Sequence, residues 1–283
     1  MAMLAPSVAI TAFRDDHLPQ GLALTRALRW PYRLEDWAFA HRLGRGYAVE
    51  LDDCLAGTAF WWPYGEDYAS LGMIVVAQEA QRRGIGAAMM DAMLADTGTR
   101  SLFLASTVAG RALYERLGFV EVDTIHQHQA VLTAAPAPVA VDATVRAATA
   151  DDLSAIHALD RDAAGMERGA LLGALLPTAD VVVAERGGRV IGYGAVRTWG
   201  RGVVVGPVAA SDADVARALI AALARAHIGI FVRIDTAVST GLSPWLESLG
   251  LPHVDDAVAM VRGTPPPPGR DARLYALSNQ SLG

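Results

Sequence analysis

Cysteine is almost absent from this sequence of 283 residues: Cys54 stands alone, so no internal disulfide can form. Apolar residues come in short runs, and none reaches the ~20 residues that a membrane-spanning helix requires. Residues 1–11 are apolar but have no positively charged leader before them, which argues against a secretory signal. These absences predict a protein of the reducing cytoplasm with no membrane partner.

An excess of positive charge is also missing, because the chain carries 30 acidic and 24 basic residues and a formal net charge of −6. Nucleic acid is therefore not expected as a partner, since phosphate backbones attract a basic surface. A neutral or cationic partner fits this charge better. What the chain does have is 52% hydrophobic residues, over a length that suits two domains with a core each.

The most informative stretch is residues 81–86, Gln-Arg-Arg-Gly-Ile-Gly. The apolar run at 71–76 before it predicts a buried strand, and residues 87–95 after it place small and apolar side chains on one helical face. A helix opened by two glycines exposes unpaired backbone N–H groups at the positive end of its dipole. The pattern predicts an anion site, and a phosphate suits that site best.

The residues that follow the glycines narrow the choice of phosphate. A nucleoside triphosphate loop needs Gly-Lys-Ser/Thr here, and Ala87 and Ala88 stand in that place instead. A dinucleotide loop needs a third glycine three residues after the second, and that position is Met89. Both of these nucleotide classes are therefore disfavoured.

Two motifs together resemble a known family. The first joins Val76 to Gln81, Gly84 and Gly86, and the second is Leu-Tyr-Glu-Arg-Leu-Gly-Phe at 113–119. They resemble the GCN5-related N-acetyltransferase (GNAT) superfamily, and the whole chain is similar to its bacterial tandem-domain members with a degenerate C-terminal domain. The resemblance implies an α/β fold of the mixed, α+β kind, in which each domain has a mostly antiparallel central sheet flanked by helices. It also implies acetyl-CoA (coenzyme A) as the cofactor.

The same resemblance implies a reaction and the residues that serve it. Acetyl would pass from acetyl-CoA to a primary amine of a small molecule or peptide by direct attack on the thioester. Tyr114 matches the family tyrosine that protonates the leaving thiolate, and Thr107 stands where an asparagine is common. The positions expected to bind the cofactor are Ile74, Val75, Val76, Gln81, Arg82, Arg83, Gly84, Ile85, Gly86, Ala87, Thr107 and Gly110.

The acceptor pocket and the general base are less sharply indicated. Aromatic residues gather in two segments, which makes Trp30, Tyr32, Trp62 and Tyr64 the candidates for substrate binding. No carboxylate lies on the strand at 71–76, so the base stays open between a water chain, the histidines at 126 and 128, and other carboxylates. The pair His126-x-His128 lacks a third ligand of clear spacing, and no metal site is predicted. The carboxylate candidates are Asp36, Glu50, Glu66 and Asp67.

The second half of the chain looks like a diverged copy of the first. Residues 48–62 align without gaps on residues 183–197, an offset of 135. At the place of the glycine loop, residues 211–216 contain Asp212 and Asp214 and no glycine. Aspartates satisfy a helix N-terminus themselves and repel a pyrophosphate, so only the first copy is expected to bind acetyl-CoA.

The expected organisation is a GNAT domain at 1–132, a proline-containing linker at 133–142, a diverged GNAT-like domain at 143–263 and a tail at 264–283. Residues 273–277 of the tail are expected to add an edge strand, to lie over the domain interface, or to be a loosely ordered terminus. A rival hypothesis is a non-catalytic acyl-CoA-binding sensor, which would explain the missing carboxylate. The sequence allows an oligomer without indicating one.

Overall fold

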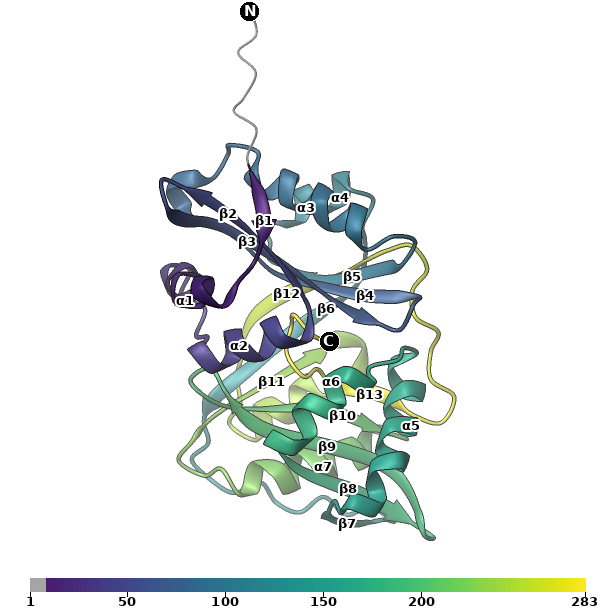
Figure 1. The fold of residues 1–283 in the computed structure, drawn as a ribbon. Coiled ribbons are helices and arrows are strands. Elements are labelled where there is room, and N and C mark those ends of the chain that lie inside the picture. Colours follow the sequence, from purple (N-terminus) through teal and green to yellow (C-terminus); the bar gives the residue numbers. More distant parts are fainter. Residues whose placement is uncertain (1–8) are drawn as a thin grey trace, which may run out of the picture.

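The computed structural model describes residues 9–283, so most of the apolar start at 1–11 lies outside the described part. The first half wraps helices around a mostly antiparallel sheet, with α1 and α2 on one face and α3 and α4 on the other (Figure 1). Its elements are β1 Ile10–Ala12, α1 Leu18–Ala27, α2 Leu34–Leu43, β2 Arg45–Leu51, β3 Cys54–Tyr64, β4 Tyr68–Val76, α3 Ile85–Asp96, β5 Ser101–Ser106, α4 Arg111–Arg116 and β6 Val120–Val131.

The second half repeats this order of elements. Strands β8 and β9 begin 135 residues after β2 and β3, at the offset that the sequence comparison predicts. Within residues 9–283, no helix is both long and apolar enough to cross a membrane. The elements are β7 Thr144–Ala147, α5 Leu153–Ala164, α6 Gly169–Leu175, β8 Asp180–Arg186, β9 Arg189–Trp199, β10 Gly202–Ala210, α7 Ala213–Arg225, β11 Phe231–Ala237, α8 Ser243–Ser248, β12 His253–Arg262 and β13 Arg273–Ala276.

The two halves share one continuous sheet, in the order β1-β2-β3-β4-β5-β12-β6-β11-β10-β9-β8-β7. Strand β6 lies between β12 and β11, and β12 lies between β5 and β6, so each half receives its last strand from the other. The boundary expected at residue 132 falls directly after β6, and the sequence analysis did not predict this exchange of last strands. The exchange satisfies the edges of both β5 and β11 across the junction between the halves.

Three clusters of buried apolar side chains hold the layers together. One lies between α3 and the first part of the sheet, and a second lies between α7 and the second part. The third crosses from one half to the other and includes the buried rings of Trp37 and Trp199. Because this third core is shared, the halves pack as one body.

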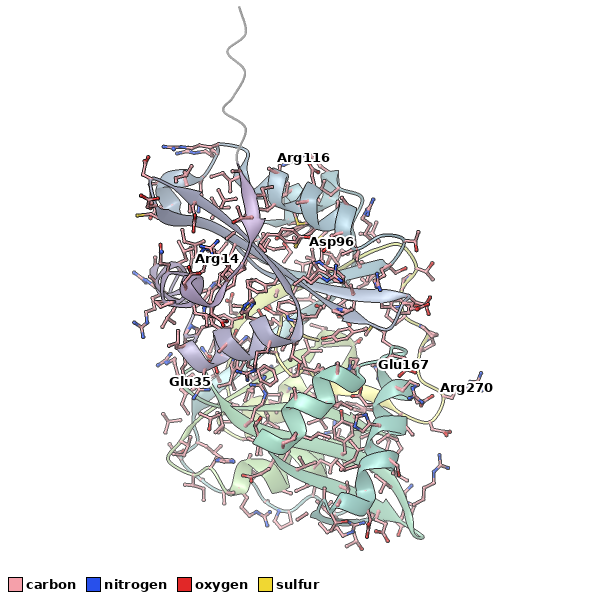
Figure 2. The ribbon with its side chains drawn as sticks, viewed as in Figure 1. Arg14, Glu35, Asp96, Arg116, Glu167 and Arg270 are labelled. Carbon is pink, nitrogen blue, oxygen red and sulfur yellow. The ribbon has the colours of Figure 1, made fainter. Side chains whose placement is uncertain are left out.

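The end of α3 is fastened to the sheet through the carboxylate of Asp96 (Figure 2). Asp96 accepts hydrogen bonds from the Tyr47 hydroxyl at 2.7 Å, from Trp61 Nε1 at 3.0 Å and from Arg45 at 3.0 Å. These three donors come from β2 and β3. Since the C-terminal end of α3 is held in this way, the position of its N-terminal end beside the glycine loop is set by the sheet.

Candidate active site

Strands β4 and β5 run in parallel and separate part-way along their length. Their pairing ends at Leu71 and Leu104, although β4 continues to Val76. The pairing of β4 with β3 is irregular at this level, where Met73 has a φ of +49° and its carbonyl accepts a hydrogen bond from the Thr58 hydroxyl at 2.9 Å. The bulge turns the rest of β4 away from β5 and leaves an open notch between them.

The glycine loop lies at the open end of this notch. Helix α3 begins at Ile85, and Gly84 precedes it with a φ of +81° and no side-chain cap. A Cβ at Gly84 would meet no atom within 4 Å, so the start of α3 faces open space. Gln81 Nε2 donates to the Val76 carbonyl at 3.2 Å and ties the loop to the end of β4. The N–H groups of this turn are therefore available to an anion such as a pyrophosphate.

The other predicted cofactor positions around this turn offer a ligand either backbone atoms or charged side chains. Val75 and Ile85 are 2% and 1% exposed and pack into the core, so they offer only backbone atoms to a ligand. Arg82 and Arg83 are exposed in the loop and bring positive charge to it. A Cβ at Gly86 would lie 3.7 Å from Val76, ordinary contact distance. The loop thus combines free amides with cationic side chains, as an anion requires.

Tyr114 stands on α4 beside the notch. Its side chain is 8% exposed and packs edge-on against Phe119, with 6.0 Å between ring centroids. Burial alone raises the pKa of Tyr114 to about 12, so its hydroxyl keeps its proton at neutral pH. Thr107 Oγ1 accepts from the Gly110 N–H at 3.3 Å and forms the turn into α4. The Tyr114 hydroxyl is therefore a proton donor in a part of the notch wall that is largely shielded from solvent.

A cavity of about 320 Å³ opens where the notch meets the second half. Ile74, Thr107 and Tyr114 line it together with two predicted acceptor residues, Trp30 and Tyr32. The Tyr32 hydroxyl lies 3.3 Å from the Ser281 hydroxyl, and its ring packs edge-on against Trp199. The cavity is therefore built by both halves of the chain. Its other polar residues are Arg29, Gln127, Gln129, Arg201, Arg233, Asp255, Asp256, Asn279 and Gln280.

Comparison with known protein families agrees with the two motifs and the repeat. An acetyltransferase (GNAT) domain family matches residues 42–121, and a second family of the same description matches residues 156–276. The chain belongs to the GNAT family. It contains two GNAT domains in tandem, joined here through their exchanged last strands.

Related proteins share this architecture over nearly their whole length. The uncharacterized N-acetyltransferase YitH of Bacillus subtilis is 29% identical over 276 residues, which is 95% of this chain and 96% of that protein. A candidate acetyltransferase from Pyrococcus horikoshii has the same fold, with a TM-score of 0.81 and 19% identity over 99% of this chain and 98% of that one. A tandem GNAT protein from the clavulanic acid biosynthesis pathway has a TM-score of 0.63 and 15% identity, covering 93% and 100%.

The second GNAT domain has a notch of its own, but the chain fills it. Pairing between β10 and β11 is limited to two residues of each strand, beginning at Val203 and Val232. Strand β13 then lies beside β10, pairing Val208 with Ala276, while the Leu277 N–H donates to a β11 carbonyl at 2.9 Å. Residues 273–276 of the tail form a strand, as one of the expectations had it. The strand lies in the notch beside β10, not at a sheet edge as expected. The tail backbone lies directly against β10, since a Cβ at Gly206 would overlap the Leu277 carbonyl oxygen.

The helix that follows this second notch is capped by its own sequence. Asp212 precedes α7, and its Oδ1 accepts a hydrogen bond from the Val215 N–H at 2.9 Å. A carboxylate therefore occupies the place at which a phosphate would bind in the first domain. Tyr275 of β13 is 5% exposed and packs in the core beneath α7.

Two predicted acceptor residues lie outside the cavity. Trp62 is 1% exposed, and its Nε1 donates to the carbonyl of Ala40 at 2.8 Å, so it is a core residue between β3 and α2. Tyr64 is 3% exposed and donates its hydroxyl to the Leu282 carbonyl. A pocket-lining role for these two residues is not supported, because inward and outward positions alternate along β3 and both side chains point into the shared core.

The carboxylates proposed as bases also lie elsewhere. Glu50 pairs with His17 at 2.7 Å, Asp36 is held by Arg33 and the Gly200 N–H, and neither carboxylate lines the cavity. Glu66 and Asp67 line a different hollow, whose other members include Glu167 and Arg270 (Figure 2). The described carboxylates that do line the cavity are Asp255 and Asp256.

The sequence did not identify these two aspartates or the tail residues. Asp255 and Asp256 lie at the start of β12, in the diverged copy, and reach the first domain's site only because β12 is exchanged. Gln280 is held there by the buried carboxylate of Asp235, to which its Nε2 donates at 3.2 Å. The two adjacent aspartates at the start of β12 are visible in the sequence. The strands that pair with β12 are not, so the sequence could not place these aspartates at the site.

Proposed function

We propose that the protein is an acetyl-CoA-dependent N-acyltransferase that transfers acetyl to a primary amine of a small molecule or peptide. The observation that carries the proposal is the open notch between β4 and β5, which ends at the uncapped start of α3. Membership of the GNAT family supports the reaction class. The filled notch and capped helix of the second domain support one cofactor per chain.

The cofactor would be held mainly by backbone. The first turn of α3 would hold the pyrophosphate, with charge added by the side chains of Arg82 and Arg83 in the loop. Backbone groups at the strand end, residues 74–76, would hold the pantetheine arm. A preorganised backbone donor near the thioester carbonyl is worth ~3 kcal/mol toward the developing oxyanion. The Gly110 N–H is already used, because it donates to Thr107 Oγ1, whereas the Thr107 hydroxyl accepts that bond and keeps its own hydrogen to donate.

The chemical step needs one proton donor and one proton acceptor. The neutral amine nitrogen attacks the thioester carbon, the carbon–sulfur bond breaks, and the thiolate takes the proton of the Tyr114 hydroxyl. The nitrogen then loses its extra proton to a base or to water. Tyr114 suits the first role because burial raises its pKa to about 12, so its hydroxyl carries a proton at neutral pH when the thiolate leaves.

The acceptor enters from the side of the second domain. Trp30 and Tyr32 provide aromatic surface at the cavity, whose lining also contains Asp255 and Asp256 and the three arginines Arg29, Arg201 and Arg233. The aromatic surface is what suits an amine that arrives as an ammonium ion. A cytoplasmic location for this reaction stays a prediction from the sequence.

The proposal is tested by a thiol-release screen with acetyl-CoA against amines, amino acids, polyamines and peptides. We expect free coenzyme A with at least one acceptor, and a thermal shift on acetyl-CoA alone. The sequence contains no lysine, so acetylation of the enzyme's own lysine side chains adds no background. Absence of both signals would remove the proposal. Binding without release by any acceptor would instead favour the acyl-CoA sensor.

A further inference from the structure

The exchange of β6 and β12 gathers three histidines and an aspartate on one face of the sheet. His253 pairs with His128 and Asp256 pairs with His126, so each pair projects to the same side. His126 and His128 are two residues apart on β6 and share that side. The register shift between His253 and Asp255 makes this possible, because without the extra residue one of the two pairs would face the other way.

A chain of hydrogen bonds determines which nitrogen of His126 carries a proton. His128 is fully buried, and its Nδ1 lies 2.9 Å from the Leu251 carbonyl, which can only accept. With the ring proton on Nδ1, the lone pair of His128 is on Nε2, which lies 3.1 Å from the Ser243 hydroxyl and can accept its proton. The Ser243 oxygen in turn accepts from His126 Nδ1 at 2.8 Å. The lone pair of His126 is therefore on Nε2.

That lone pair faces a carboxylate. His126 Nε2 lies 3.6 Å from Asp256 Oδ1, and His253 Nε2 lies 2.7 Å from the same oxygen. One ligand atom from each of these three residues falls within 4.8 Å of the others. The Nε2 lone pair of His126 and the carboxylate oxygen of Asp256 repel one another unless a cation lies between them. That cation is either a proton or a metal ion.

We propose that His126, His253 and Asp256 form a binding site for one divalent ion of the zinc class. Two imidazoles and one carboxylate are a ligand set that zinc accepts, with a fourth position left for water or another ligand. Ser243 acts as a positioning residue that orients the His126 ring. His253 is about a third exposed, and its ring stacks on that of His126 with 4.2 Å between ring centroids. The ion joins β6 of the first domain to β12 of the second.

The site adjoins the cavity of the proposed acyltransferase without depending on it. Asp256 is shared between them, since it also lines the cavity. Metal binding is measured in the absence of acetyl-CoA, so a failure of the proposed reaction would not remove the metal site. Failure to bind metal would likewise not remove the proposed reaction.

The experiment uses the full chain without an affinity tag, stripped of metal, in a Cys54→Ser background that removes the exposed thiol as a competing ligand. Elemental analysis after dialysis against Zn²⁺ should give one ion per chain, and competition with a chromophoric chelator gives the Kd. Co²⁺ should produce the visible absorption of a tetrahedral site. Mg²⁺ is the negative control, because it prefers oxygen ligands.

Variants separate this site from adventitious binding. His126→Gln, His253→Gln and Asp256→Asn should each weaken Zn²⁺ binding by at least about tenfold, and Ser243→Ala by about 10- to 100-fold. His157→Gln on α5, outside the cluster, should bind as the parent does. Equal thermal unfolding of the metal-free variants shows that they fold. The proposal is overturned if the parent binds no Zn²⁺ saturably, or if the ligand variants bind as well as the His157 control.

Discussion

The notch between β4 and β5 and the notch between β10 and β11 begin in the same way. In each domain two parallel strands pair at one end, and the sheet is irregular where they part. In the first domain the gap leads to Gly84 and an uncapped helix, whereas in the second it holds β13 and leads to the carboxylate of Asp212.

The comparison shows two ways in which this fold can accommodate the backbone groups that are exposed where two parallel strands part. Parted strands leave backbone donors and acceptors without partners, and such groups are costly when buried. The second domain satisfies them with its own tail, through β13 and the Leu277 N–H. The notch of the first domain is open, and under our proposal acetyl-CoA would satisfy them there. We therefore expect changes in the first notch to alter binding and chemistry, and changes in the second to alter stability alone.

The largest effect should come from Gly84→Asp. A carboxylate at the start of α3 copies the Asp212 cap, so acetyl-CoA binding should be lost. At a concentration of 1,000 times Kd, acetyl-CoA stabilises a binding protein by about 4.1 kcal/mol, and this shift should vanish in calorimetry. Gly84→Asn keeps the size and tolerates the φ of +81° without charge.

Two controls decide what a loss at Gly84 means. Gly84→Asn should retain most of the binding, and an equal loss in that variant would point to backbone shape rather than charge. Gly187→Asp places the same side chain at a φ of +56° in the β8–β9 turn, where a Cβ meets nothing within 4 Å. It should leave acetyl-CoA binding unchanged.

The next effect should come from Tyr275→Ala in the second notch. This side chain is 5% exposed and packs in the core beneath α7, so its removal should lower the free energy of unfolding by about 3 kcal/mol in urea titrations. Acetyl-CoA should still bind with a stoichiometry of one, because Asp212 continues to cap α7. A second equivalent of bound cofactor would contradict our account of the filled notch.

Tyr114→Phe should slow turnover by about 100-fold, which corresponds to about 2.7 kcal/mol in the activation free energy. The Kd for acetyl-CoA should change little, because only the hydroxyl is removed. Since the pKa of Tyr114 is raised to about 12, its protonated form persists and kcat should show no decline from this group up to about pH 10. The matched control is Tyr275→Phe, which should turn over normally. Unchanged kcat in Tyr114→Phe would remove its role as an acid.

The smallest effect should come from Asp212→Ala. Loss of this N-cap should cost about 1 kcal/mol of unfolding free energy, measured by denaturant titration, and leave kcat unaltered. Asp214→Ala in the same first turn makes no cap, so it should cost less. If Asp212→Ala instead changed turnover, the second domain would be closer to the chemistry than the comparison implies.

Much of the fold could be predicted because its signals are local. Helix α3, strand β4 and the offset of 135 residues between the copies follow from periodicity and from residues close in sequence. The pairing of the last strands could not be predicted in the same way, since β6 and β12 have equivalent patterns and either partner satisfies them. The position of Trp62 in the core could not be predicted either, because an aromatic residue in a sequence is compatible with a core as well as with a pocket.

By itself the sequence determined that the first copy has a free helix start and the second does not, because Gly84 and Asp212 impose this through their own backbone and side chain. Only the tertiary structure decided what surrounds that start. It brought Asp255 and Asp256 into the first domain's cavity, placed His253 beside His126, and laid β13 in the second notch. The physical reason is that strand pairing joins segments more than 100 residues apart, and its register is set by contacts that no short motif contains.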